Sequence, residues 1–115
     1  MLKIYGIRNC DSCRKACRWL EANAIKYNFH DLRKDGIDTD LLESWFKRTE
    51  WTTLLNRRST TWRQLSESQR EKLDKTKVLN LMSEHPTLIK RPVAISGKKI
   101  TVGFNEDCYR EHVVY

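Results

Sequence analysis

Cys10 and Cys13 lie where a strand pattern changes into a helix pattern, and this junction constrains the fold more than any other feature of the chain. Residues 2–5 alternate between faces and stop at Gly6, as short strands do. The next segment repeats small and apolar residues at helical spacing, in a stripe of Cys13, Ala16, Cys17, Leu20 and Ala24. Residues 25–32 alternate again, which predicts a right-handed β-α-β unit with parallel strands.

The middle of the chain, from about 38 to 85, predicts a helical insertion. Its most polar stretch, 56–61, has little periodicity and predicts a loop. Two further short helices are expected to begin near Ser66 and near Thr76, and Pro86 ends the second of them. We therefore expect helices between the two β-containing ends of the chain.

The C-terminal part predicts a hairpin followed by a helix. Residues 93–96 and 99–102 are rich in β-branched residues and are joined by a Gly-Lys pair, which predicts a β-hairpin. A last helix is expected to begin at Asn105 and to carry Cys108 and Val113. The 115 residues contain neither a linker nor a low-complexity segment, so we expect a single α/β domain over the whole chain, in the order β-α-β, helical insertion, β-β-α.

The chain lacks the patterns of exported and membrane proteins. Its mean hydropathy is −0.70, and no apolar stretch approaches the roughly 20 residues that a spanning helix needs. The N-terminus has no signal-peptide pattern, so we expect a cytoplasmic protein without a membrane partner. In a reducing compartment the four cysteines are expected to carry redox or metal chemistry rather than two structural disulfides.

The start of the first predicted helix favours a reactive thiolate at Cys10. Asn9 or Asp11 is expected to be the N-cap, because amide and carboxylate oxygens accept hydrogen bonds from the first helical N–H groups. These N–H groups and the positive end of the helix dipole stabilise an anion. Arg8 and Arg14 are close in sequence, so the pKa of Cys10 is expected to lie below that of a free thiol.

Cys13 lies one helical turn after Cys10, where its sulfur can attack a mixed disulfide formed at Cys10. The pair then acts as nucleophile and resolving thiol, the alternative being that both are inert small hydrophobic residues. A zinc site of these two cysteines with Cys17 and His30 is a further alternative, but the chain has no second paired knuckle, and we predict no metal site. Cys17 and Cys108 are expected to be core or half-buried residues.

The net charge of +7 raises the possibility of a nucleic-acid partner. Basic and acidic residues alternate along the chain, however, and no nucleic-acid-binding motif directs the positive charge. We therefore expect no direct nucleic-acid binding. Positive charge near one site is instead expected to attract small anions, such as an oxyanion or the carboxylates of glutathione.

Five motifs together resemble one family of proteins. They are the Cys10–Cys13 turn, Trp19-Leu20-Glu21, the segment from Leu55-Asn56 to Thr60-Thr61-Trp62-Arg63, the run His85-Pro86 to Lys90-Arg91-Pro92, and Val102-Gly103-Phe104-Asn105. On these motifs the chain resembles the ArsC/Spx/YffB family of thioredoxin-like proteins over nearly its whole length. The resemblance is closest to the YffB subgroup of arsenate-reductase-like proteins.

The resemblance implies a thioredoxin-like fold with a four-stranded mixed sheet and an inserted helical region. It implies that Cys10 is the redox thiol, that Pro92 is a cis-proline facing it, and that Arg91 supplies a cation to the thiolate and to an anionic substrate. It further implies a thiol-disulfide oxidoreductase that has no bound cofactor and uses glutathione as co-substrate. Glutaredoxin or thioredoxin are possible protein partners, and we expect a monomer.

Two positions depart from the arsenate reductases that the chain resembles. Those enzymes carry an arginine directly after the paired leucines and another after the hairpin, where this chain has Asn56 and Gly103. Arg57 and Arg58 follow one and two residues later, and one of them is expected to bind the substrate. Because tetrahedral oxyanions need several converging donors, arsenate is expected to be a poor substrate.

The second cysteine favours another member of the same family. Spx-type transcription regulators resemble this chain in carrying both Cys10 and Cys13, whereas YffB-like sequences commonly carry only the first. Spx regulators bind the C-terminal domain of the RNA polymerase α subunit and use the two cysteines as a redox switch. Residues 49–52 lack the glycine that Spx-like sequences have there. An enzyme is therefore the leading interpretation, with a redox-sensing regulator or a true arsenate reductase as alternatives.

Overall fold

The computed structural model describes residues 2–112 and divides the chain into two compact units. The first unit contains residues 2–35 and 91–112, and the second contains residues 36–90. The second unit includes the predicted helical insertion of about 38–85. In the described part of the chain, no helix is both long and apolar enough to cross a membrane.

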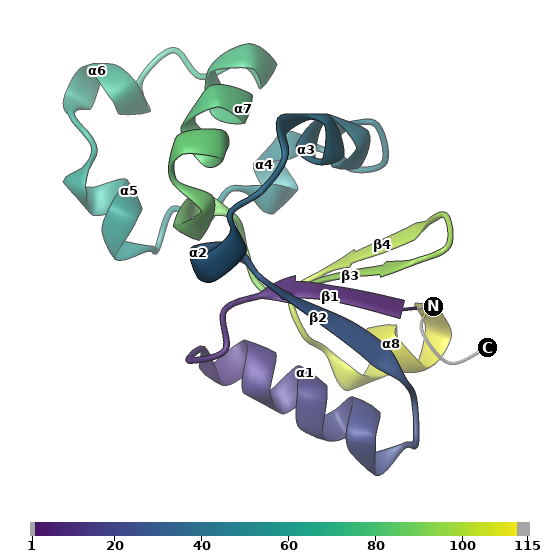
Figure 1. The fold of residues 1–115 in the computed structure, drawn as a ribbon. Coiled ribbons are helices and arrows are strands. Elements are labelled where there is room, and N and C mark those ends of the chain that lie inside the picture. The colour runs from purple at the N-terminus through teal and green to yellow at the C-terminus, as the bar shows by residue number, and fades with distance from the viewer. Residues whose placement is uncertain (1, 113–115) are drawn as a thin grey trace. The chain divides into compact units, whose positions relative to one another are not determined.

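The first unit is built on a four-stranded mixed sheet (Figure 1). Its strands are β1 (Leu2–Gly6), β2 (Tyr27–Asp31), β3 (Val93–Ser96) and β4 (Lys99–Val102), in the order β2-β1-β3-β4. β1 pairs in parallel with β2, while β3 pairs antiparallel with both β1 and β4. This arrangement confirms the predicted β-α-β unit, the predicted hairpin and the thioredoxin-like fold class.

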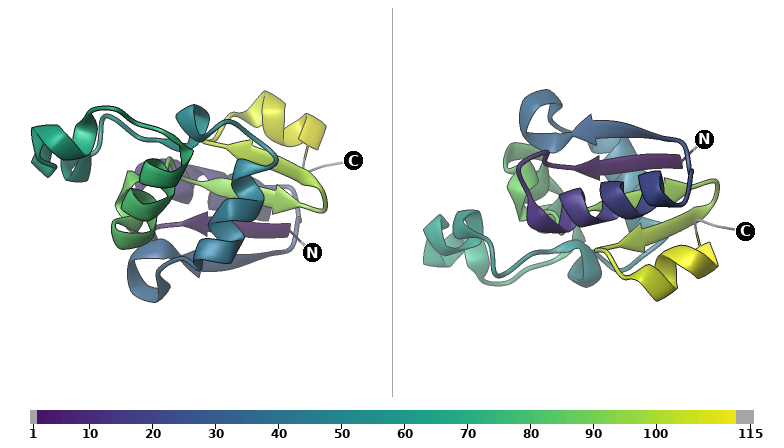
Figure 2. Two further views of the ribbon diagram at one scale, coloured as in Figure 1. Left: turned by 90° about the horizontal axis from the view of Figure 1, so that it is seen from above. Right: turned by 90° about the horizontal axis from the view of Figure 1, so that it is seen from below.

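Two helices cover one face of this sheet, namely α1 (Asp11–Ala22) and α8 (Glu106–His112) (Figures 1 and 2). Between them and the sheet lies an apolar cluster of Leu2, Ile4, Ala16, Leu20, Ala94 and Tyr109. Trp19 and Phe104 both meet the ring of Tyr109 edge to face, at centroid distances of 5.8 and 5.0 Å. These contacts fix α1 and α8 against the sheet. The predicted position of Val113 lies outside the described residues.

The helix α1 ends earlier than its apolar stripe predicts. Ala24 lies beyond the helix in the left-handed region, at φ 57°, and its amide donates to the carbonyl of Glu21 at 3.1 Å. The amide of Ile25 donates to the carbonyl of Leu20 at 2.9 Å, which completes a tight C-terminal turn. This turn delays the second strand, so β2 begins at Tyr27 rather than at residue 25. A short helix, α2 (Leu32–Asp35), follows β2.

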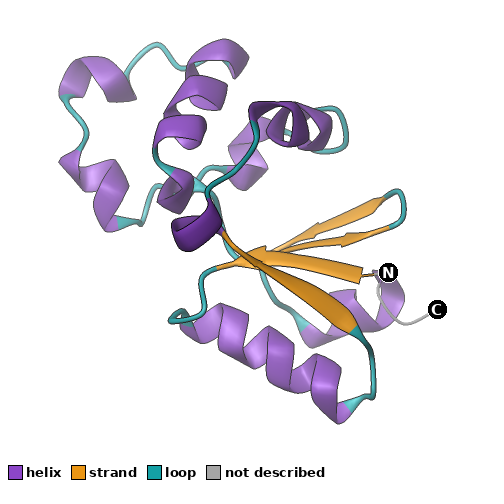
Figure 3. Cartoon of the chain, viewed as in Figure 1, coloured by secondary structure: helices purple, strands orange, loops and turns teal. Residues whose placement is uncertain are grey.

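The second unit consists of short helices joined by loops (Figure 3). They are α3 (Thr39–Phe46), α4 (Trp51–Leu54), α5 (Thr60–Gln64), α6 (Glu67–Arg70), α7 (Lys75–Glu84) and the 3₁₀ helix η1 (Pro86–Leu88). Asp38, Ser59, Ser66 and Asp74 each cap one of these helices through the side-chain oxygen. Such caps satisfy N–H groups that have no partner within the helix, which lets short helices persist.

One short strand-like pairing in the second unit was not predicted from the sequence. Leu55 forms an antiparallel bridge with Ile89, and the amide of Asn56 donates to the carbonyl of Leu88 at 2.7 Å. The amide of Lys90 donates to the carbonyl of Leu54 at 2.7 Å. This pairing holds the start of the 56–59 loop against the segment that leads to Arg91.

Candidate active site

Cys10 is the N-cap of α1, with an extended backbone at φ −130° and ψ 128°. The prediction of Asn9 or Asp11 as N-cap is wrong, because both side chains bind Arg14 instead. One Arg14 nitrogen donates to Asn9 Oδ1 at 3.1 Å, and the other donates to Asp11 Oδ1 at 2.6 Å. The amide of Arg14 donates to the carbonyl of Cys10 at 2.9 Å, so the helix starts with the cysteine at its positive end.

The surroundings of Cys10 favour its thiolate. The side chain is half-buried, and burial alone would raise the pKa of Cys10. The backbone amide of Cys13, the side chain of Arg91 and the thiol of Cys13 all act in the opposite direction, and the net pKa of Cys10 lies below its ordinary value. The Cys10 sulfur makes no capping hydrogen bond of standard geometry, so the amide contributes mainly through its dipole.

Cys13 is the opposite case, a buried thiol that resists ionisation. Its side chain is 1% exposed. Burial, aided by the neighbouring charge of Cys10, raises the pKa of Cys13 to about 12, although the amide of Ile7 acts against this rise. The two cysteines therefore differ in acidity: Cys10 loses its proton at a lower pH than an ordinary thiol, whereas Cys13 keeps its proton at neutral pH.

Gly6 makes room for the sulfur of Cys13. A Cβ atom at position 6 would lie 2.5 Å from Cys13 Sγ and 3.6 Å from Cζ of Phe29. No side chain fits at that separation without moving the sulfur. Gly6 at the end of β1 thus leaves the space that the Cys13 sulfur occupies. The sequence pattern alone does not reveal this requirement for glycine.

We expect Gly6→Ala to lower the free energy of unfolding by about 1–3 kcal/mol, the usual cost of overpacking a core. Cys13→Ala removes the sulfur, so the double variant should be about as stable as Cys13→Ala alone. Urea unfolding of the four proteins measures this coupling. An equal loss of stability in both backgrounds would show that another contact of Gly6 is responsible.

Arg91 and Pro92 lie directly before the first residue of β3. The peptide bond between them is cis, as the resemblance implies. Pro92 is buried, and its carbonyl accepts a hydrogen bond from the amide of Gly103 at 2.8 Å. Gly103 has φ 81°, a conformation that side chains rarely adopt, so the backbone itself favours glycine where the arsenate reductases have an arginine.

Arg57 and Arg58 lie in an exposed turn of the second unit. The guanidinium of Arg57 stacks over the ring of Trp62, 5.6 Å from its centroid, and the amide of Arg58 donates to Asn56 Oδ1 at 3.1 Å. The structure thus brings Cys10, Cys13 and Arg91 together within the first unit. The substrate-binding role of the two arginines of the second unit stays a prediction.

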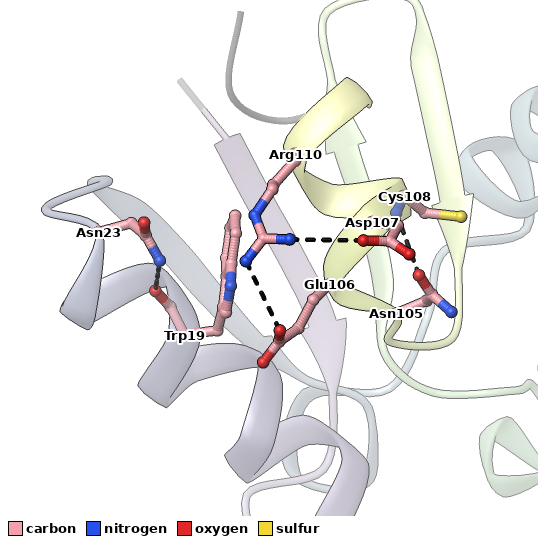
Figure 4. Close-up of polar contacts among 7 residues, drawn as sticks. All are labelled: Trp19, Asn23, Asn105, Glu106, Asp107, Cys108 and Arg110. Atoms are coloured by element: carbon pink, nitrogen blue, oxygen red, sulfur yellow. Dashed lines mark hydrogen bonds and ion pairs between the residues drawn. The ribbon is translucent and has the colours of Figure 1, made fainter.

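The other two cysteines differ from each other. All four cysteines are free thiols, and Cys17 is half-buried, as expected. Cys108 is exposed on α8, where its amide donates to Asn105 Oδ1 at 3.2 Å (Figure 4), so the prediction of a core or half-buried residue is wrong. Tyr109, the next residue, is fully buried in the core. Among residues 2–112, no three His, Cys, Asp or Glu side chains cluster in a way that could hold a metal ion.

The fold and the cysteine pair define a thioredoxin-like protein. The model of the ArsC family matches residues 5–112, and the chain belongs to this family. An uncharacterized protein of Haemophilus influenzae is 44% identical over 96% of both chains. The global transcriptional regulator Spx 2 of Bacillus anthracis is 33% identical over 96% of this chain and 86% of its own. The solved structure of the YFFB (PA3664) protein is 40% identical, covers 99% of this chain and 100% of its own, and superposes with a TM-score of 0.95.

Proposed function

We propose that the protein is a cytoplasmic thiol-disulfide reductase that uses glutathione as co-substrate. One observation carries this proposal: Cys10, at the helix start beside Arg91, has a lowered pKa, while Cys13 has a raised one. A lowered pKa increases the fraction of nucleophilic thiolate at neutral pH, and a reducing compartment keeps both thiols available. Membership of the ArsC family supports thiol-based reduction in general.

In the first step of the proposed reaction, the Cys10 thiolate attacks one sulfur of a disulfide substrate. A new S–S bond forms at Cys10, the substrate S–S bond breaks, and the second substrate sulfur leaves as a thiolate. Arg91 stabilises the charge of Cys10 before the attack. In this proposal the same guanidinium also attracts the carboxylates of glutathione.

In the second step, either glutathione or Cys13 attacks the mixed disulfide. When Cys13 attacks, its proton passes to the departing thiolate and a Cys10–Cys13 disulfide forms. The mixed disulfide no longer carries the Cys10 charge, and this charge is one of the factors that raise the pKa of Cys13. Cys13 therefore becomes easier to ionise after the first step. Two further glutathione molecules then reduce the internal disulfide.

The test is intact mass spectrometry with peptide mapping after brief exposure to glutathione disulfide. We expect the first glutathionyl group on Cys10, followed by its loss as the Cys10–Cys13 disulfide forms. Cys13→Ala should trap the mixed disulfide at Cys10. First modification at Cys13 or Cys108 would contradict the proposed roles.

Arsenate is predicted to be a poor substrate. Each charge-assisted hydrogen bond contributes about 1.5–3 kcal/mol, so turnover should lie at least about a hundredfold below that of a reductase with both missing arginines. A coupled assay with glutathione and glutaredoxin measures this, with disulfide turnover by the same preparation as control. Robust arsenate reduction that is lost in Arg57→Gln or Arg58→Gln would show that the exposed turn completes an oxyanion site.

A second candidate function is that of a redox-sensing transcription regulator. The Spx relatives favour it, because they align with almost the whole chain. In that case the Cys10–Cys13 disulfide changes the affinity for the RNA polymerase α subunit and performs no turnover. Capture of the α subunit by the reduced and the oxidised protein distinguishes this function from the reductase.

A further inference from the structure

A cavity of about 230 Å³, lined by two cysteines, lies between α1 and β2. It belongs wholly to the first unit. In the sheet order, β2 lies on one side of β1, while β3, which follows Arg91 and Pro92, lies on the other. We call this cavity the α1–β2 pocket. It is lined by Arg8, Cys13, Arg14, Cys17, Arg18, Glu21, Tyr27 and Phe29.

The rim of the α1–β2 pocket is positively charged. Three arginines line it against a single carboxylate, that of Glu21. The guanidinium of Arg8 lies 4.8 Å from the centroid of the Phe29 ring, which holds this cation over an apolar wall. Arg14 shares its charge with Asp11, whereas Arg18 forms no ion pair within residues 2–112. The pocket therefore favours a small anion with an apolar portion.

A tyrosine lies beside both the thiol and the carboxylate of this pocket. The hydroxyl of Tyr27 donates to Glu21 Oε2 at 2.7 Å, and Cys17 lies close enough to the phenol to raise its pKa. Because the hydroxyl proton points to Glu21, the phenol oxygen is left to accept the thiol proton of Cys17. Burial, together with these two partners, raises the pKa of Tyr27, so the phenol stays neutral and can pass a proton along.

We propose that the α1–β2 pocket binds small anionic disulfides and that Cys17 exchanges with them. The Cys17 sulfur forms a bond with one sulfur of the ligand, the ligand S–S bond breaks, and the other half leaves as a thiolate with the electron pair. The proton of Cys17 moves to the oxygen of Tyr27 while the phenol proton moves to Glu21. The product is a mixed disulfide at Cys17, in addition to the chemistry at Cys10.

The test uses the full chain with Cys10→Ala, so that its outcome does not depend on the proposed reductase activity. Three disulfides of different charge are compared: anionic glutathione disulfide, neutral 2-hydroxyethyl disulfide and cationic cystamine. Peptide mapping measures the rate at Cys17 and at Cys108 in the same sample. Cys108 serves as the internal control, because it is exposed and has Asp107 and Glu106 beside it, both bound to Arg110 (Figure 4).

We expect glutathione disulfide to react about tenfold faster at Cys17 than the neutral disulfide does, because the arginines concentrate the anion. At Cys108 we expect the two disulfides to react at similar rates, or glutathione disulfide to react more slowly than the neutral disulfide. Arg18→Gln should lower the preference at Cys17 about threefold. Lys15→Gln removes one charge from the same helix outside the α1–β2 pocket and should leave the preference nearly unchanged.

Tyr27→Phe tests the proton path and keeps the ring. It should slow reaction at Cys17 with all three disulfides by at least about tenfold, without changing the preference among them. Thermal unfolding of each variant controls for the fold. The proposal is overturned if glutathione disulfide modifies Cys108 as fast as Cys17, or if Arg18→Gln and Lys15→Gln lower the preference equally. Unchanged rates in Tyr27→Phe would overturn the proton path.

Discussion

Cys10→Ser is expected to lower disulfide reductase turnover by at least about a thousandfold, because the reaction then has no covalent nucleophile. A serine hydroxyl fits the same N-cap position but does not ionise near neutral pH. The assay follows glutathione-dependent reduction of 2-hydroxyethyl disulfide. Cys108→Ser is the matched control, since it changes an exposed thiol on α8 outside both thiol sites, and it should retain most of the turnover.

The same thiol gives a pH dependence whose sign follows from its pKa. The pKa of Cys10 lies below its ordinary value, so the thiolate persists to lower pH than in a free cysteine. Alkylation of Cys10 by iodoacetamide should therefore stay fast below the pKa of about 8.5 of a free thiol and fall only at more acidic pH. Titration of Cys10 like a free cysteine, or faster alkylation of Cys108, would contradict the assignment.

The sequence pattern predicted the four strands, α1 and α8 of the first unit, but not the short helix α2. The β-branched runs at 93–96 and 99–102 coincide with β3 and β4. The start of α1 was less predictable, because cysteine is not a preferred N-cap. Asn9 and Asp11 are preferred, but Arg14 binds both side chains and leaves the cap position to Cys10.

Other features of the site depend on packing between elements that are distant in sequence. The room that Gly6 leaves for Cys13 is set by how α1 packs on β1. Tyr27 meets Cys17 and Glu21 only because β2 lies beside α1. The local periodicity of the sequence carries no information on such contacts. The spacing of Cys10 and Cys13 was informative because both residues belong to one helical turn, so their proximity depends only on local structure.

The division of roles between the two cysteines follows from their environments. Both thiols share one helix start, but Cys10 is partly open and faces Arg91, whereas Cys13 is enclosed between α1 and the end of β1. At Cys13, burial outweighs the opposing effect of the Arg91 charge, so this thiol keeps its proton. The fold therefore makes Cys10 the more reactive thiol and keeps Cys13 protonated until Cys10 has formed a mixed disulfide.

Arg91→Ala is expected to slow reaction of Cys10 with glutathione disulfide by about ten- to a hundredfold, since a hydrogen bond to a charged group contributes about 1.5–3 kcal/mol. Removing the cation disfavours the thiolate, so the pKa of Cys10 should rise and less thiolate remain at neutral pH. Arg91→Lys should recover only part of the rate, because an ammonium cannot reproduce the planar donation of a guanidinium. Stopped-flow kinetics over a pH series measure both the rate and the shift.

The Arg91 variants also separate the two candidate functions. Arg110→Ala is the matched control, because this arginine pairs with Glu106 and Asp107 on α8 and should leave the pKa of Cys10 unchanged. For a reductase, turnover and the pKa of Cys10 change together in Arg91→Ala, and the RNA polymerase α subunit is captured in neither redox state. For a regulator, unmodified protein shows negligible turnover and captures the α subunit in a manner that depends on oxidation of Cys10 and Cys13. We expect the first result, because Arg91 acts on the thiolate before any disulfide forms and thus favours repeated attack on substrate.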